Sequence, residues 1–85
     1  MQKYSTWTPE QRATGNRIRR ALAVAYPPII YDDIGAAIDR SGEYVNKVMN
    51  DGARLSSDGL TAMLGKIEKA VAELESERAE IKEAA

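Results

Sequence analysis

Residues 31–52, with the sequence YDDIGAAIDRSGEYVNKVMNDG, constrain the fold more than any other stretch of the chain. Four apolar residues recur there at helical spacing: Ile34, Ile38, Val45 and Val48. Ser41 stands between the two pairs and is suited to cap a helix start, and Gly52 is suited to the left-handed position that follows a helix end. We therefore predict two short helices, over about residues 31–39 and 42–50, that are joined by a tight turn and share one core.

The chain before this stretch predicts a supporting helix. Thr8 suits an N-cap, Pro9 suits the first helical position, and Gln11 completes a capping box. The helix should run to about Ala25, because the proline pair at 27–28 cannot continue it. Its apolar stripe consists of Ile18, Ala21, Leu22 and Ala25. Three flanking side chains are expected to pack as well: Trp7 onto this helix, and Ile29 and Ile30 into the core.

The chain after the stretch predicts one long helix, over about residues 57–83. At 1.5 Å per residue this helix would be about 40 Å long, too long to bury fully on so small a body. Its heptad positions are apolar at all but one place: Leu60, Leu64, Ile67, Val71, Leu74, Arg78 and Ile81. Three heptads are near the minimum for a coiled coil.

Two interpretations of this heptad stripe remain open. The helix can fold only on its own body, or it can divide its stripe between that body and a second chain. We expect the division, with Leu60, Leu64 and Ile67 on the two short helices and the stripe from Val71 onward on a second chain. The candidate dimerisation residues along the stripe are Leu64, Ile67, Val71, Leu74 and Ile81.

Length and composition limit what can support the fold. A chain of 85 residues allows one small domain, whose core is marginal without further support. There is no cysteine, which excludes disulfides, and no histidine, which removes the commonest metal ligand and general base. We expect no metal or cofactor, and a homodimer. The expected fold is all-α, a compact bundle of about four helices with the motif in region 1–55 and packing and dimerisation in region 56–85.

Charge is divided unevenly along the chain. The net charge is −1, but residues 1–55 carry eight Lys/Arg against six Asp/Glu, and residues 56–85 carry four against seven. The basic part therefore suits an anionic partner, although ordinary mixed-charge helices explain the difference equally well. No apolar run is long enough to span a membrane and the start lacks a signal-peptide pattern, so we expect a cytoplasmic protein.

The apolar spacing of residues 31–52 resembles the helix-turn-helix of small phage and bacterial repressors of the Cro type, also called XRE-like. Counted from Tyr31 as the first position, the matching residues are Ile34 (fourth), Gly35 (fifth), Ile38 (eighth), Val45 (fifteenth) and Val48 (eighteenth), followed by the tail Asn50-Asp51-Gly52. The family usually has glycine at the ninth position and an apolar residue at the tenth, where this chain has Asp39 and Arg40. We expect a turn in which Asp39 adopts the backbone angles that glycine takes.

This resemblance implies a transcription regulator, a dimeric repressor that binds double-stranded DNA with the helix at 42–50 in the major groove. The implied DNA-contacting residues are Arg40, Ser41, Glu43, Tyr44, Asn46, Lys47, Asn50 and Arg54. Asparagine pairs well with adenine, lysine with guanine and glutamate with cytosine, which suits Asn46, Lys47 and Glu43. Positive charge on this helix is sparse, so two copies, with recognition helices about 34 Å apart on a palindromic site, would be needed.

The same residues and helices also allow other interpretations. The same polar residues suit a solvated helix face, and Tyr44 suits the edge of a core. A non-DNA adaptor or anti-activator acting through the C-terminal helix would keep the helical body. It would not need four polar residues on one surface: Arg40, Asn46, Lys47 and Arg54. An enzyme is not expected, because the sequence has no Gly-rich phosphate loop, metal-ligand cluster or nucleophile–base pair.

Overall fold

The structure, a computed structural model, describes the backbone of residues 6–84 and the side chains of residues 6–80. The elements in chain order are α1 (Pro9–Val24), α2 (Tyr31–Ala37), α3 (Gly42–Asp51), the 3-10 turn η2 (Gly52–Arg54) and α4 (Ser57–Ala84). The described part of the chain contains no strand, which confirms the all-α class. Within it, no helix combines the length and the apolar character that crossing a membrane requires.

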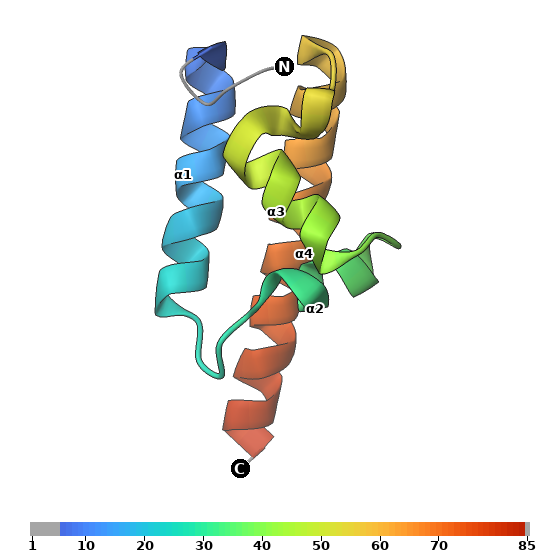
Figure 1. Cartoon of the computed structure of the whole chain (residues 1–85). Coiled ribbons are helices and arrows are strands. Elements are labelled where there is room, and N and C mark those ends of the chain that lie inside the picture. The colour runs from blue at the N-terminus through green and yellow to red at the C-terminus, as the bar shows by residue number, and fades with distance from the viewer. Residues whose placement is uncertain (1–5, 85) are drawn as a thin grey trace.

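Helices α1 and α4 lie side by side and run in the same direction, while α2 and α3 pack across them (Figure 1). Gln11, near the start of α1, joins the two long helices: its buried Nε2 donates to the carbonyl oxygen of Ser57 at 3.0 Å and to Oγ1 of Thr61 at 3.0 Å. Its Oε1 meanwhile accepts from the Thr8 N–H, which confirms the capping box. One side chain therefore caps α1 and sets its register against α4.

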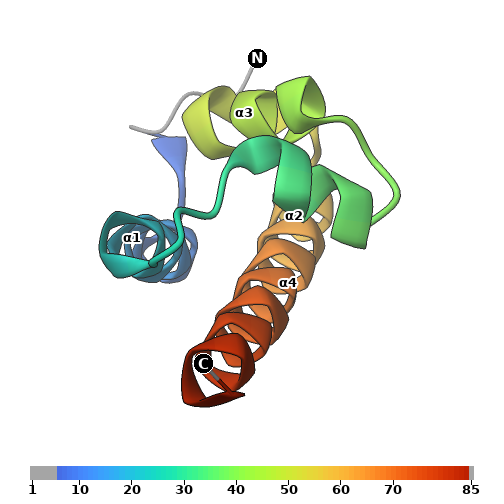
Figure 2. The same ribbon diagram turned by 90° about the horizontal axis from the view of Figure 1, so that it is seen from below.

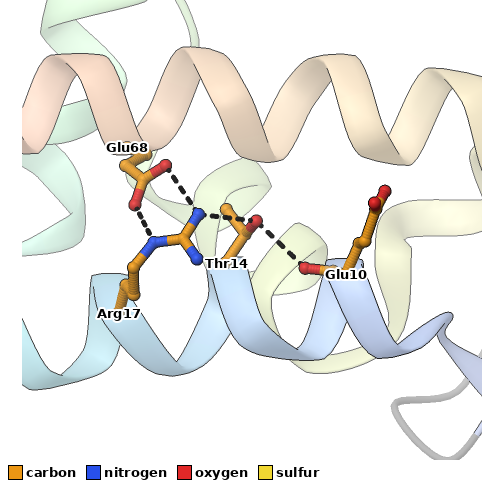
Figure 3. A network of polar contacts seen from close by, with 4 residues as sticks. All are labelled: Glu10, Thr14, Arg17 and Glu68. Carbon is orange, nitrogen blue, oxygen red and sulfur yellow. Dashed lines mark hydrogen bonds and ion pairs between the residues drawn. The ribbon is translucent and has the colours of Figure 1, made fainter.

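A second contact between α1 and α4 lies two turns further along (Figure 3). Arg17 Nε donates to Glu68 Oε2 at 2.7 Å, and its Nη2 donates to Glu68 Oε1 at 3.2 Å and to Thr14 Oγ1 at 3.1 Å. The Arg17 guanidinium, through these hydrogen bonds first and its charge second, holds the pKa of the Glu68 carboxyl below its ordinary value. The Arg17 side chain is 56% exposed and that of Glu68 is 38% exposed, so solvent screens the pair and its contribution to stability is small.

We expect Arg17→Gln to raise the pKa of Glu68 toward the ordinary glutamate range. A carboxyl whose pKa is lowered by folding stabilises the fold above its unfolded pKa, and this contribution is lost as the pH falls through the folded pKa. Arg17→Gln should therefore flatten the dependence of stability on pH in the acidic range. An NMR titration of the Glu68 carboxyl measures the shift, with Arg20→Gln, at an exposed position of the same helix, as the control. An unchanged Glu68 titration in Arg17→Gln would show that another group lowers this pKa.

The core lies where the four helices meet and contains most of the predicted apolar residues. Its buried members are Trp7, Ile18, Ile29, Ile34, Val45, Val48, Met49, Leu60, Leu64, Ile67, Ala70 and Val71. Trp7 packs onto α1 as predicted, against Gly15, where an added Cβ would lie 3.2 Å from the Trp7 ring. Ile29 is 5% exposed, but Ile30 is 55% exposed, so the prediction that Ile30 also enters the core is wrong.

Helix α4 has almost the predicted bounds and accounts for the long dimension of the molecule. It contains 28 residues, or about 42 Å at 1.5 Å per residue, in a molecule that measures 45 × 23 × 16 Å. Leu60, Leu64 and Ile67 are buried within the chain, as predicted, but α4 packs on α1 as well as on the two short helices.

In the outer half of the heptad stripe, the prediction for Val71 needs correction. Val71 is only 2% exposed, and Leu74 is half-buried against the core of its own chain. Because Leu64, Ile67 and Val71 are all buried within one chain, no surface of these side chains is left for a second copy. These three residues therefore belong to the core of their own chain, and the prediction that they form a dimer interface is corrected. The side chain of Ile81, the last candidate, lies outside the described side chains.

Arg78, the one polar residue of the heptad stripe, makes contacts that the heptad pattern did not anticipate. Its Nε donates to the carbonyl oxygen of Pro27 at 2.6 Å, and its Nη2 donates to that of Pro28 at 3.0 Å. Nη2 also lies 3.5 Å from Oδ2 of Asp33 in the first turn of α2. Helix α4 is therefore tied to the α1–α2 link by hydrogen bonds, where the sequence predicted a contact with a second chain.

Candidate nucleic-acid interface

The turn between α2 and α3 is built around a left-handed residue. Asp39 has φ 60°, in the region that favours glycine but admits aspartate, which confirms the role expected for it. Helix α2 ends at Ala37, two residues earlier than predicted, and the N–H of Arg40 then donates to the carbonyl oxygen of Gly35 at 2.7 Å. Aspartate thus supplies the backbone conformation for which the resembled family uses glycine.

Two glycines let α2 and α3 approach backbone to backbone. A Cβ on Gly35 would lie 2.5 Å from the carbonyl oxygen of Arg40, and a Cβ on Gly42 would lie 2.8 Å from the backbone nitrogen of Asp32. Contacts this short leave room for neither side chain. Gly35 is buried at this contact, whereas its neighbour Ala36 is exposed.

Both ends of α3 are fixed as predicted. Ser41 Oγ accepts from the N–H of Tyr44 at 3.1 Å, and Gly52 has the left-handed φ of 79° at the C-cap. Arg19 of α1 also donates to the carbonyl oxygen of Met49, which satisfies one of the free carbonyls at the end of α3. The inner face of α3 is fully buried through Val45, Val48 and Met49. The helix is therefore held at both ends and along one face.

The outer face of α3 carries a polar stripe at helical spacing. Its members stand at i, i+3, i+4 and i+7 and are all exposed: Glu43, Asn46, Lys47 and Asn50. In Figure 2, α3 lies at the upper edge of the molecule. We call these four residues the α3 stripe. It presents one carboxylate, one ammonium and two amides on a short, rigid helix.

Side chains of this face contact one another. Asn50 Nδ2 donates to Oδ1 of Asn46 at 2.7 Å, which orients the two amides one turn apart. The Arg40 guanidinium lies 5.7 Å from the centre of the Tyr44 ring, a cation–π distance that places this cation at the N-terminal end of α3. Tyr44 is half-buried and packs against the core. Part of its side chain therefore forms the edge of the core, which is the alternative role that the sequence suggested.

Arg54 reaches the C-terminal end of α3 through an unusual turn. Gly52, Ala53 and Arg54 are all left-handed, with φ of 79°, 50° and 62°. The Asp51 carboxylate supports this run by accepting from the N–H of Ala53 at 2.9 Å. Arg54 thereby comes to line one open hollow together with Tyr44 and Lys47. The sequence placed Arg54 only in a loop, and the fold brings it beside the stripe.

The eight candidate residues lie in α3 or next to its ends. Arg40 and Ser41 stand at the N-terminal end of the helix, and Arg54 stands at its C-terminal end. Lys66, Lys69 and Glu73 of α4 line a separate hollow beside Asp39 in the turn, which contains no residue of α3.

The arrangement offers hydrogen-bond donors and acceptors along one helix, with cations at both of its ends. Among the residues that the structure describes, no group of three or more acidic side chains gathers to hold a metal ion. Comparisons with protein-family models, with curated proteins and with solved structures found no match.

Proposed function

We propose that the protein is a sequence-specific DNA-binding regulator, a dimeric repressor that inserts α3 into the major groove of double-stranded DNA. The observation that carries the proposal is the α3 stripe. A helix buried on one side and fixed at both ends presents exposed amide, carboxylate and ammonium groups on the other side. An α-helix fits the major groove, where these groups can read the edges of base pairs.

The groups around the stripe suit the DNA backbone. Ser41 and the free N–H groups at the start of α3 can bind a phosphate, as helix N-termini commonly do. Arg40 and Arg54, at opposite ends of a helix about 15 Å long, suit phosphates on either side of the groove. Within the stripe, Asn46 with Asn50 suits adenine, Lys47 suits guanine and Glu43 suits the amino group of cytosine.

The alternative function, an adaptor or anti-activator that acts through the C-terminal helix, has less support. Such a protein would bind through exposed apolar residues of α4. Leu64, Ile67 and Val71 are instead buried against their own chain, and Arg78 is engaged with the α1–α2 link. The described part of α4 therefore offers little of the surface that this function needs.

Selection of bound sites from a random DNA pool, followed by mobility shift at low salt, tests the proposal. We expect a palindrome whose half-sites are about 10 base pairs apart, which is one turn of DNA. Binding should weaken as salt rises, because phosphate contacts release counterions. Absence of binding at low salt, where phosphate attraction is strongest, would contradict the proposal and leave the adaptor as the better explanation.

Asn46→Ala and Arg54→Ala should weaken binding in different ways. Asn46→Ala should cost about 1–3 kcal/mol, and mainly at one base position of the site. Arg54→Ala should weaken binding to all sequences by a similar factor and reduce the dependence on salt. Affinities measured over all single-base variants of the selected site separate the two patterns. An equal loss across every sequence for Asn46→Ala would rule out its contact with a base.

A further inference from the structure

Three consecutive residues after α3 have left-handed backbone angles, and only the first of them is glycine. Gly52, Ala53 and Arg54 have φ of 79°, 50° and 62°. Glycine adopts such angles freely, whereas in alanine and arginine the Cβ atom comes too close to the following carbonyl oxygen. Gly52 alone forms the C-cap of α3. The turn η2 therefore contains strain at Ala53 and Arg54 that the ending of the helix does not require.

Neighbouring groups fix the strained turn: the Asp51 carboxylate accepts from the N–H of Ala53 at 2.9 Å. The carbonyl oxygen of Gly52 accepts from the N–H of Leu55, also at 2.9 Å. Ala53 and Leu55 are partly buried and pack against the core. Strained residues persist only where their surroundings fix them in this way, and they gather at functional sites. The side chain that this turn leaves exposed is that of Arg54.

The turn brings Arg54 to the same surface as a second cation. Arg54 lines a hollow that is open to solvent, together with Lys47 and Tyr44 of α3. The hollow also includes Asp51, whose carboxylate accepts the hydrogen bond from Ala53. Two cations against one carboxylate leave the hollow net positive, which favours an anion. The strained backbone and the gathered charge therefore point to the same kind of ligand.

We propose that Ala53 is a positioning residue: its left-handed backbone sets Arg54 beside the C-terminal end of α3, where the guanidinium binds a DNA phosphate. This inference rests on the proposed function and deepens it, because it names what places the phosphate-binding arginine. The C-terminal end of an α-helix carries partial negative charge and has no free N–H groups to bind a phosphate. A phosphate contact at this end of α3 therefore depends on a cation, which Arg54 supplies.

The left-handed turn limits where the Arg54 guanidinium can lie before DNA arrives. Association ordinarily loses affinity when loops and side chains must become ordered at the interface. A turn that is already fixed in the free protein avoids the loop part of that loss. Different backbone angles at Ala53 would leave the arginine present but directed elsewhere, so the phosphate contact would be lost although the cation remains.

Ala53→Val and Ala53→Asn test the proposal. The branched Cβ of valine makes left-handed angles rare, whereas asparagine tolerates them. At low salt, Ala53→Val should weaken binding to one half-site roughly 10-fold, by the same factor as Arg54→Ala, and should reduce the salt dependence as Arg54→Ala does. Ala53→Asn should bind as the wild type does. Ala62→Val, which makes the same substitution at an exposed position of α4, is the control and should also bind as the wild type does.

A double-mutant cycle separates positioning from a general structural role. If Ala53 acts through Arg54, Ala53→Val should cause no further loss of DNA binding in a protein that already carries Arg54→Ala. If Ala53→Val instead loosens α3, its loss should add to that of Arg54→Ala. All affinities are measured at a temperature where circular dichroism shows fully folded protein. Additive losses, or an Ala53→Val protein that binds as the wild type does, would overturn the inference.

Asp51 provides a second test that leaves Ala53 in place. Asp51→Ala and Asp51→Asn remove the same charge, but only asparagine keeps an oxygen that can accept from the N–H of Ala53. Asp51→Ala should therefore bind DNA more weakly than Asp51→Asn, and the difference should disappear when Arg54→Ala is added to both. Equal affinities of the two Asp51 variants would contradict a fixed turn, also where Ala53→Val fails to fold.

The outcomes separate this inference from the proposed function. DNA binding that Asn46→Ala weakens at one base, but that Ala53→Val leaves unchanged, would overturn the inference and retain the proposed function. A wild-type protein that binds no DNA at low salt would contradict the proposed function. Titration with inorganic phosphate, followed by NMR at the Arg54 Nε–H, then tests the turn alone: Ala53→Asn should shift as the wild type does, and Ala53→Val should shift less. Equal shifts in all three proteins would overturn the inference.

Discussion

Gly35→Ala is expected to lower the free energy of unfolding by about 1–3 kcal/mol, although alanine is the better helix former. A Cβ at this position would lie 2.5 Å from the carbonyl oxygen of Arg40 and 2.8 Å from the carbonyl carbon of Ser41. Both atoms belong to the backbone of the turn, which the hydrogen bond from Arg40 N–H to Gly35 O also holds. No side-chain rotation can relieve the contact, so α2 and α3 must separate. Urea denaturation measures the loss.

Gly65→Ala is the matched control for this prediction. Gly65 lies inside α4, where nothing would stand within 4 Å of an added Cβ. The same substitution there should raise stability by about 0.5–1 kcal/mol, because alanine loses less backbone entropy in a helix. The two variants should therefore change stability in opposite directions. A stabilised Gly35→Ala would mean that α2 and α3 lie further apart than described, and the close packing of this unit would be wrong.

Gly35→Ala also links the fold to the proposed function. If α2 and α3 separate, α3 loses the support on its inner face while its exposed side chains remain the same. DNA binding should therefore weaken more than the stability loss alone explains, since the folded molecules present α3 at an altered angle. Measurement at a temperature where the variant is fully folded isolates this effect. Unchanged affinity there would show that DNA binding tolerates movement of α3.

The helix boundaries could be predicted because they depend on contacts within a few residues. The Thr8 cap, the Ser41 cap and the left-handed Gly52 each involve a hydrogen bond or a backbone angle that neighbouring residues determine. The α3 stripe followed from spacing for the same reason, since the buried and exposed faces of one helix are fixed by its period of 3.6 residues.

What covers each apolar face could not be predicted, because that depends on distant parts of the chain. The heptad pattern shows correctly that Val71 and Leu74 share a face of α4, but the same pattern serves a core and a dimer equally well. The error at Ile30 has a related cause. Adjacent side chains in an extended link point to opposite sides, so only one of Ile29 and Ile30 can be buried, and two residues carry no periodicity to tell which.

The candidate site was incomplete at sequence level because two of its features depend on backbone conformations that sequence rarely reveals. Ala53 and Arg54 adopt left-handed angles without being glycine, and only those angles turn Arg54 toward Lys47 and Tyr44. The close approach at Gly42 depends on the position of Asp32, ten residues earlier. The spacing of apolar residues indicates neither the left-handed angles nor the close approach.

Arg78→Ala is expected to destabilise the protein by about 1–3 kcal/mol, which is unusual for a residue so near the end of a helix. The guanidinium donates to the carbonyl oxygens of Pro27 and Pro28 and lies near the Asp33 carboxylate. Its side chain is only 18% exposed, so water replaces these bonds only in part. The loss should be concentrated in the α1–α2 link and the start of α2. Hydrogen exchange at the N–H groups of Asp33 and Ile34, which donate to Ile30 O, measures it.

Three further variants separate the possible causes of that loss. Asp33→Asn removes the charge but keeps an oxygen that can accept from Ile30 N–H, so a small effect there assigns the loss to the carbonyl bonds. Arg78→Lys keeps the charge but cannot span two carbonyls as a planar guanidinium does, and it should restore little stability. Glu77→Ala, at the adjacent exposed position of α4, should change stability least. If Arg78→Lys restored full stability, charge alone would tie α4 to the link. The tie by fixed hydrogen bonds would then be contradicted.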